Sequence, residues 1–128
     1  VYGLGILHHL QISKCIKEIS RILKPEGTLL FIEPLGTNPF INLYRKLTPN
    51  SRSKDEHPLV SKDFEILKSR FNIVKLKYYG FLTLIFFPFY RSSNSIIFNF
   101  LVKLDQFLFK MKLFRFFAWS TLIIAKKN

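Results

Sequence analysis

One short stretch of the sequence carries the side chains of a general base. Asp55, Glu56 and His57 are consecutive, and a carboxylate beside an imidazole can orient the ring and stabilise its charged form. The same residues also fit an Asx-type turn that Pro58 ends, which involves no chemistry. We therefore expect either a proton-transferring His57 or a tight turn at this point of the chain.

A second candidate is Glu33, which follows an apolar run over residues 28–32. An uninterrupted apolar run is typical of a strand that is covered on both faces of a parallel sheet. Pro34 ends the run, because proline cannot donate to a sheet ladder. Open α/β sheets bind ligands at the carboxyl ends of their strands, so Glu33 is placed where it could act on a substrate. A loop cap, or a salt bridge with Arg45 or Arg52, is the structural alternative.

The sequence contains few residues that could bind a metal ion or act as a thiol nucleophile. With three histidines and a single cysteine, Cys15, we expect no metal site and no internal disulfide. Cys15 shares the apolar stripe of a predicted helix, where we expect it to pack against the core. This cysteine usage favours a reducing, cytoplasmic setting.

The elements that position these residues alternate between strand and helix. Residues 1–7 form an apolar run typical of a strand, and apolar residues three and four positions apart predict a helix over 11–23. With the strand at 28–32 they make a strand–helix–strand unit, whose two strands run parallel. The chain opens inside an element, so we expect it to be a fragment of a longer protein.

The remainder of the chain divides into five predicted parts. In chain order they are a loop-rich, substrate-side insertion (35–60, with a short helix at 42–47), a helix (62–71), a half-exposed strand (72–79), an apolar segment followed by a helix (80–117, with the helix over 93–112) and a last strand (119–125). The apolar residues at 80–90 are too few to span a bilayer, which needs ~20 residues. They line an acceptor pocket, lie on a membrane surface or cover the sheet.

The net charge of the chain indicates which classes of binding partner it attracts. Twenty Lys and Arg against eight Asp and Glu give a formal charge of +12, which attracts anionic partners such as nucleic acid, acidic lipid or phosphorylated substrates. The lysines lie on the polar sides of amphipathic elements, and no nucleic-acid-binding motif occurs. We therefore expect no nucleic-acid partner.

Two segments resemble a known family. They read Gly-Ile-Leu-His-His-Leu over 5–10 and Glu-Ile-Ser-Arg-Ile-Leu-Lys-Pro-Glu-Gly-Thr-Leu-Leu-Phe-Ile-Glu-Pro over 18–34. The chain resembles the second half of class I S-adenosylmethionine-dependent methyltransferases of the ubiquinone- and menaquinone-methylating type. The resemblance implies an α/β fold, the C-terminal part of a Rossmann-like sheet. Its parallel strands would be joined by a last antiparallel strand, with helices on the faces. Residues 1–128 would form a single incomplete domain.

The resemblance also implies a function and a set of site residues. It implies methyl transfer from S-adenosylmethionine to a small, apolar, lipid- or quinone-like acceptor, in the cytoplasm or peripherally at a membrane. Gly3, Leu4 and Gly5 match family positions beside the methionine end of the cofactor, and His8 belongs to the family's histidine pair. Strand packing is the alternative for the glycines.

One departure from the family pattern bears on activity. The family's glycine-rich loop and ribose-binding acid are absent, so we expect this chain alone to bind the cofactor poorly and to be inactive. The alternative function is a non-catalytic remnant, or a basic module for membrane surfaces or nucleic acid. The oligomeric state is left open by the sequence.

Overall fold

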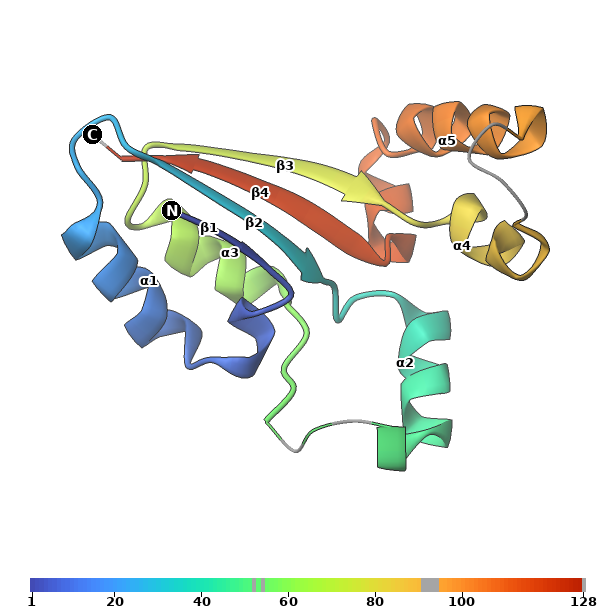
Figure 1. Ribbon diagram of the computed structural model, residues 1–128, viewed down its shortest axis with the longest axis horizontal. Coiled ribbons are helices and arrows are strands. Elements are labelled where there is room, and N and C mark those ends of the chain that lie inside the picture. The colour runs from blue at the N-terminus through green and yellow to red at the C-terminus, as the bar shows by residue number, and fades with distance from the viewer. Residues whose placement is uncertain (52, 54, 91–94, 128) are drawn as a thin grey trace.

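The computed structural model describes residues 1–51, 53, 55–90 and 95–127. The described residues form a four-stranded sheet with the strand order β1-β2-β4-β3. The strands are β1 (Tyr2–Leu4), β2 (Thr28–Pro34), β3 (Ile73–Tyr79) and β4 (Ser120–Lys126). Two helices, α1 (Ile12–Ile22) and α3 (Ser61–Lys68), lie together on one face of the sheet (Figure 1). The architecture is α/β, as the sequence predicts.

The pairing of the strands places the last strand inside the sheet. β1 runs parallel to β2, with Gly3 opposite Phe31, whereas β4 runs antiparallel to both β2 and β3. Because β4 lies between them, β2 and β3 run in the same direction. The expected strand–helix–strand unit and the expected antiparallel last strand are both confirmed.

β1 is shorter than the strand predicted over residues 1–7. Gly5 has a φ of +58°, a left-handed conformation that glycine adopts without strain. Its N–H donates to the Ile32 carbonyl oxygen at 2.8 Å, and the chain then turns into the short helix η1 (Leu7–His9). The strand prediction is therefore right for Tyr2–Leu4 and wrong from Gly5 onward.

β2 is covered on one face only, so the prediction of a strand buried on both faces is wrong for the described structure. Leu29 and Phe31 are buried in the core beneath the helices, whereas Leu30 and Ile32 are 39% and 40% exposed. No described helix lies over their face of the sheet (Figure 1). This face, here named the open face, carries large side chains from three strands, namely Tyr2, Leu4, Leu30, Ile32, Leu122 and Ile124.

The insertion over 35–60 contains the helix α2 (Pro39–Leu47), which begins before the helix predicted at 42–47. Its N-cap is Asn38, whose side-chain oxygen accepts from the Phe40 N–H at 2.9 Å. Proline suits the first helical position, because its missing N–H would have no helical partner there. The Asn-Pro pair is therefore the sequence signal for the true helix start.

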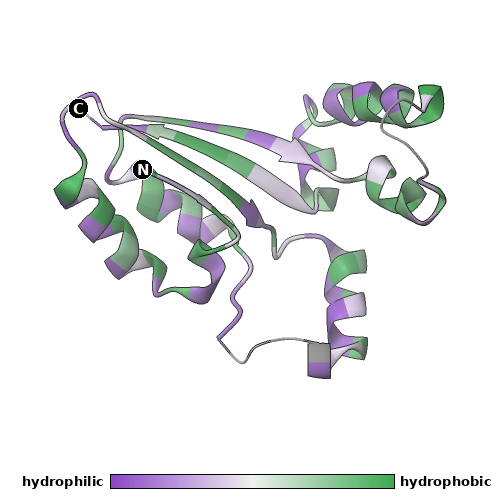
Figure 2. Ribbon diagram, in the orientation of Figure 1, coloured by the Kyte–Doolittle hydropathy of each residue, from purple (hydrophilic) through white to green (hydrophobic). Residues whose placement is uncertain are grey.

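Between β3 and β4 the chain forms short helices beyond the end of the sheet, here named the helical cap. They are α4 (Leu82–Phe86), η3 (Phe87–Phe89), α5 (Ile96–Leu108) and η4 (Lys112–Phe117). The helix predicted over 93–112 corresponds to α5, although its predicted start at Ser93 lies outside the described residues. Ser95 caps α5, since its hydroxyl accepts from the Phe98 N–H at 3.4 Å. Figure 2 shows that hydrophobic residues (green) continue from the sheet into α4 and α5.

Candidate functional site

Glu33 lies near the carboxyl end of β2, and its side chain is fully buried. Its Oε1 accepts from the N–H groups of Ile6 and Leu7 at 2.9 and 2.8 Å. Its Oε2 accepts from the His8 N–H at 3.3 Å and from His8 Nδ1 at 2.8 Å. The carboxylate thus caps the first turn of η1 and ties it to β2. A contact between Glu33 and a substrate remains a prediction.

Arg45, which was considered as a partner of Glu33, forms its hydrogen bonds elsewhere. Arg45 Nη1 donates to the Leu35 carbonyl oxygen and to Asn42 Oδ1, both at 2.9 Å. Arg52 lies outside the described residues. The hydrogen bonds of the Glu33 carboxylate come instead from the segment 6–8.

All three histidines lie near Glu33, at the end of β2. This region, with Glu33, His8, His9, His57 and Asp63, is here named the rim. The His57 N–H donates to the His8 carbonyl oxygen at 2.6 Å, which joins the insertion to η1. His57 Nε2 lies 3.4 Å from Asp63 Oδ2, whereas Asp55 Oδ2 lies 3.5 Å from His9 Nδ1. The acid that contacts His57 is therefore Asp63, in the first turn of α3. Asp55, its near neighbour in sequence, contacts His9.

Gly3 in β1 and Gly5 just after it serve different purposes. A Cβ on Gly3 would overlap Cε1 of the Phe31 ring, so the core packing of Phe31 requires glycine there. A Cβ on Gly5 would meet His8 Cε1 at 3.6 Å, an ordinary contact, so glycine is favoured there by its positive φ and not by lack of space. The Leu4 side chain is exposed on the open face. Cofactor contacts by these residues and by His8 remain predictions.

Cys15 lies on the core side of α1, packed against the buried residues. Partial burial raises the pKa of its thiol, and the charge of Glu33 raises that pKa further. A thiol with a raised pKa stays protonated at neutral pH and is a weak nucleophile. Within the described residues, no three His, Cys, Asp or Glu side chains are grouped so that they could hold a metal ion.

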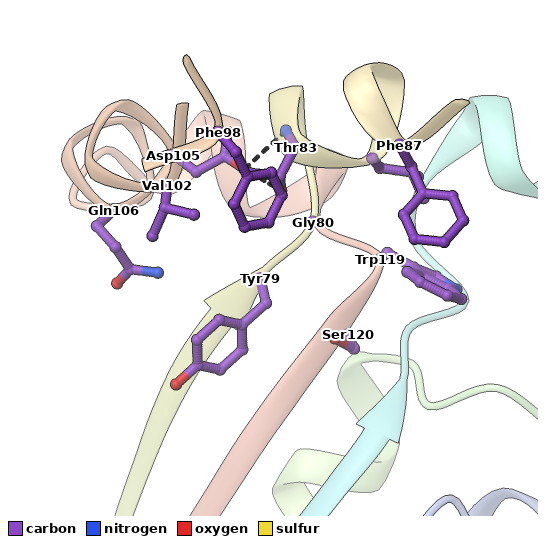
Figure 3. A pocket seen from close by; sticks show the side chains of 11 residues that line it. Tyr79, Gly80, Thr83, Phe87, Phe98, Val102, Asp105, Gln106, Trp119 and Ser120 are labelled. Atoms are coloured by element: carbon purple, nitrogen blue, oxygen red, sulfur yellow. Dashed lines mark hydrogen bonds between the residues drawn. The ribbon is translucent and has the colours of Figure 1, made fainter. Parts of the chain in front are cut away.

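A cavity of about 300 Å³ opens between the end of the sheet and the helical cap (Figure 3). Its lining is mainly aromatic and aliphatic, with Tyr79, Leu84, Phe87, Phe98, Val102 and Trp119 among the side chains. Asp105 lies at its edge with its carboxylate engaged, since it accepts from the Leu82 N–H at 2.8 Å and from the Thr83 hydroxyl at 2.7 Å. The cavity therefore offers apolar walls, and its acid is committed to capping α4.

The register of the sheet relates this cavity to the rim. Ser120, which lines the cavity, pairs with Pro34, the residue after Glu33. The cavity thus lies at the same end of the sheet as the rim. It is on the side of the open face, because Tyr79 and Ser120 belong to that face by strand alternation.

A second cavity, of about 260 Å³, lies at the same end of the sheet, between η4 and the start of α3. Lys112 and Arg115 line it together with Tyr78 and Phe64. The Arg115 guanidinium lies 5.5 Å from the centroid of the Tyr78 ring. Burial raises the pKa of Tyr78, and the charge of Arg115 opposes that shift. This cavity is the more cationic of the two.

The strand order can be set beside that of known proteins. No protein-family profile matches the chain, and no curated protein matches it. A crystal structure of a SAM-dependent methyltransferase from Archaeoglobus fulgidus is similar to 99% of this chain, with a TM-score of 0.58 and 17% sequence identity. The chain has a methyltransferase-type fold. It spans 58% of the length of that protein.

In this methyltransferase-type fold, the rim and the cavities lie at the carboxyl ends of the parallel strands, where open α/β sheets bind ligands.

Sequence reasoning missed Asp63 as the partner of His57, and it missed Trp119 as a cavity residue. Asp63 was recognisable as a first-turn acid of α3, but its pairing depends on the path of the insertion. None of the described helices is long and apolar enough to cross a membrane.

Proposed function

We propose that this chain is part of a longer enzyme that transfers a methyl group from S-adenosylmethionine to a small apolar acceptor. The observation that carries the proposal is the strand order, with antiparallel β4 between the parallel strands β2 and β3. The likeness to the Archaeoglobus fulgidus enzyme supports the same proposal through its fold. The polar rim and the apolar cavity supply the two kinds of surface that such an enzyme needs.

The described residues fit one wall of a cofactor site and not the whole of it. Gly5 has no side chain and is partly exposed, and the Leu4 side chain is exposed beside it. The Glu33 carboxylate already accepts four hydrogen bonds, so it is poorly placed to accept from ribose hydroxyls. Under this proposal the remaining cofactor contacts come from a segment of the enzyme that pairs with β1 and covers the open face.

The acceptor binds, under this proposal, in the cavity between the sheet and the helical cap. A volume of about 300 Å³ is within the range of small-molecule sites. Its walls include Trp119, Phe87 and Phe98, which favour an apolar or ring-containing molecule. Holding such an acceptor in one orientation is the main task of a methyltransferase, because in-line transfer depends on positioning.

His57 lies at the rim and does not line the cavity, so we propose it as a base for acceptors that extend from the cavity to the rim and must lose a proton. Its ring is largely exposed and lies 3.4 Å from the buried Asp63 carboxylate, which can orient it. A positioned general base contributes on the order of 10²-fold or more to a rate. Glu33 and His8 act in this proposal through the conformation of η1, which they hold against β2.

Measuring cofactor binding tests the proposal that the cofactor site is divided between this chain and another segment of the enzyme. We expect the 128-residue chain to show no micromolar binding of S-adenosylmethionine by isothermal titration calorimetry. The enzyme extended by the coding sequence upstream of Val1 should bind it and should transfer labelled methyl to an apolar acceptor. Micromolar binding by the chain alone would contradict the divided site. An extended enzyme with no methyl transfer to any acceptor would contradict the function.

The role of His57 is tested in the same extended enzyme. His57→Ala should lower kcat on the order of 10²-fold without a matching change in KM. His9→Ala is the matched control, because His9 contacts the exposed Asp55 at the same rim, and it should change kcat by less than about twofold. Unchanged turnover of His57→Ala would remove the base from the proposal.

A further inference from the structure

The outer side of α5 carries large apolar residues that point into solvent. Ile96, Phe100 and Phe107 are 86%, 61% and 61% exposed. They are four and seven residues apart, so they lie on one side of the helix. An exposed stripe of this size needs an explanation, because scattered single apolar residues are normal but a continuous row is not.

The other side of α5 is already accounted for by contacts within the chain. Phe98 and Val102 line the cavity, and Asp105 caps α4. α5 is therefore apolar around most of its circumference, a property of helices that are buried or lie in a lipid interface. The preceding short helices add further exposed side chains, namely Ile85, Phe87 and Phe89.

The charges beside this stripe are all of one sign. Lys103 lies on the same side of α5, seven residues after Ile96, and it is exposed. Lys110 Nζ lies 5.9 Å from the centroid of the Phe107 ring. Between residues 80 and 119 the sequence contains one acid, Asp105, and that acid is buried. The surface of the helical cap therefore combines apolar side chains with uncompensated positive charge.

We propose that the helical cap docks on an anionic lipid bilayer, with α5 lying in the plane of the interface. Exposed Ile and Phe side chains would enter the headgroup region, while the lysines reach anionic headgroups from the same helix. A second copy of the chain would fit the apolar stripe of α5 less well than a bilayer does. A symmetric contact through this stripe would bring two positively charged helix faces together, and the one acid between residues 80 and 119 is buried.

Docking in this orientation would bring the cavity close to the bilayer. Phe87 and Val102 belong to the cavity lining and also to elements of the docking surface. An apolar molecule dissolved in the bilayer would then have a short path into the cavity. The docking proposal nevertheless stands independently of methyl transfer, because it rests on exposure and charge.

Vesicle flotation tests the proposal with the 128-residue chain. The chain should float at low salt with vesicles of phosphatidylcholine and phosphatidylglycerol. Its affinity for vesicles of phosphatidylcholine alone should be lower by roughly 30-fold, the contribution of two lysines near an anionic surface. Aggregated protein sinks in this assay, so it is not mistaken for bound protein.

Three variants distinguish docking through the helical cap from nonspecific adsorption to vesicles. The double variant Phe100→Glu with Phe107→Glu should lose flotation. Ile22→Glu should retain it, because Ile22 is comparably exposed, at 59%, on α1 at the opposite end of the sheet (Figure 1). The double variant Lys103→Gln with Lys110→Gln should lose the roughly 30-fold preference for anionic vesicles. Circular dichroism confirms that each variant is folded.

Several outcomes would overturn the proposal. Wild-type chain that stays at the bottom of the gradient with anionic vesicles would do so. Equal flotation of the Phe100→Glu and Phe107→Glu double variant and the wild type would do so as well. Binding of a DNA duplex without vesicle binding would assign the positive charge to nucleic acid. A stable dimer that buries α5 and does not float would assign the stripe to a second copy.

Discussion

At the scale of single residues, two buried carboxylates perform the same structural task. Glu33 accepts from backbone N–H groups at the start of η1, and Asp105 accepts from those at the start of α4. In each case the acceptor is more than 20 residues away in sequence from its donors. Charged acceptors form stronger hydrogen bonds than neutral ones, which offsets the cost of burying the carboxylate. Such a role depends on tertiary structure and cannot be read from local sequence.

Replacing Glu33 by Gln tests this cap. The variant keeps the size of the side chain but loses the charge and turns an NH₂ group toward backbone donors. We expect the free energy of unfolding to fall by roughly 2–4 kcal/mol in urea denaturation, because buried donors lose a charged acceptor. Glu18→Gln is the control, since the exposed pair of Glu18 and Arg21 should contribute less than about 1 kcal/mol. Equal losses in the two variants would contradict a capping role.

At the scale of elements, prediction succeeded where the sequence has a clear period. Residues of α1 recur three and four apart, and β3 alternates between core and solvent, so both were located from local pattern. In the helical cap, α5 was located in the same way, whereas α4, η3 and η4 were not, because aromatic residues of the cap face both the cavity and the solvent. The gathering of the three histidines at one rim was equally beyond reach, because it depends on how the insertion returns to η1.

The packing of β1 on β2 gives a prediction at this scale. Gly3→Ala would place a methyl group against the Phe31 ring, so we expect a loss of about 1–3 kcal/mol in unfolding free energy. Phe31→Leu should relieve the clash, and the double variant should therefore lose less than the sum of the single losses. Additive losses in the double-mutant cycle would show that Gly3 does not need the space beside Phe31.

At the scale of the whole molecule, the sheet has two faces of different character. One face forms the core with α1 and α3, and the open face presents side chains of β1, β2 and β4. The sequence of β2 reads as apolar on both sides, so it predicted a cover that the described residues do not provide. An apolar face of this kind is a place for association, either with another part of an enzyme or with other copies.

Two neighbouring leucines of β2 test this difference between the faces. Leu30→Lys should reduce binding of the dye ANS and change the unfolding free energy by less than about 1 kcal/mol, because the side chain points outward. Leu29→Lys should cost more than about 3 kcal/mol, since it buries an unpaired charge in the core. Similar losses in the two variants would indicate that the open face is covered in solution.

The position of β4 has a consequence for the order of assembly during synthesis. β4 supplies the hydrogen bonds on one edge of β2 and on one edge of β3, yet it follows both of them in the chain. A nascent chain on the ribosome must therefore wait for residues 120–126 before these two ladders can form. Until then two strand edges are available to chaperones or to wrong partners, and contacts so distant in sequence form slowly.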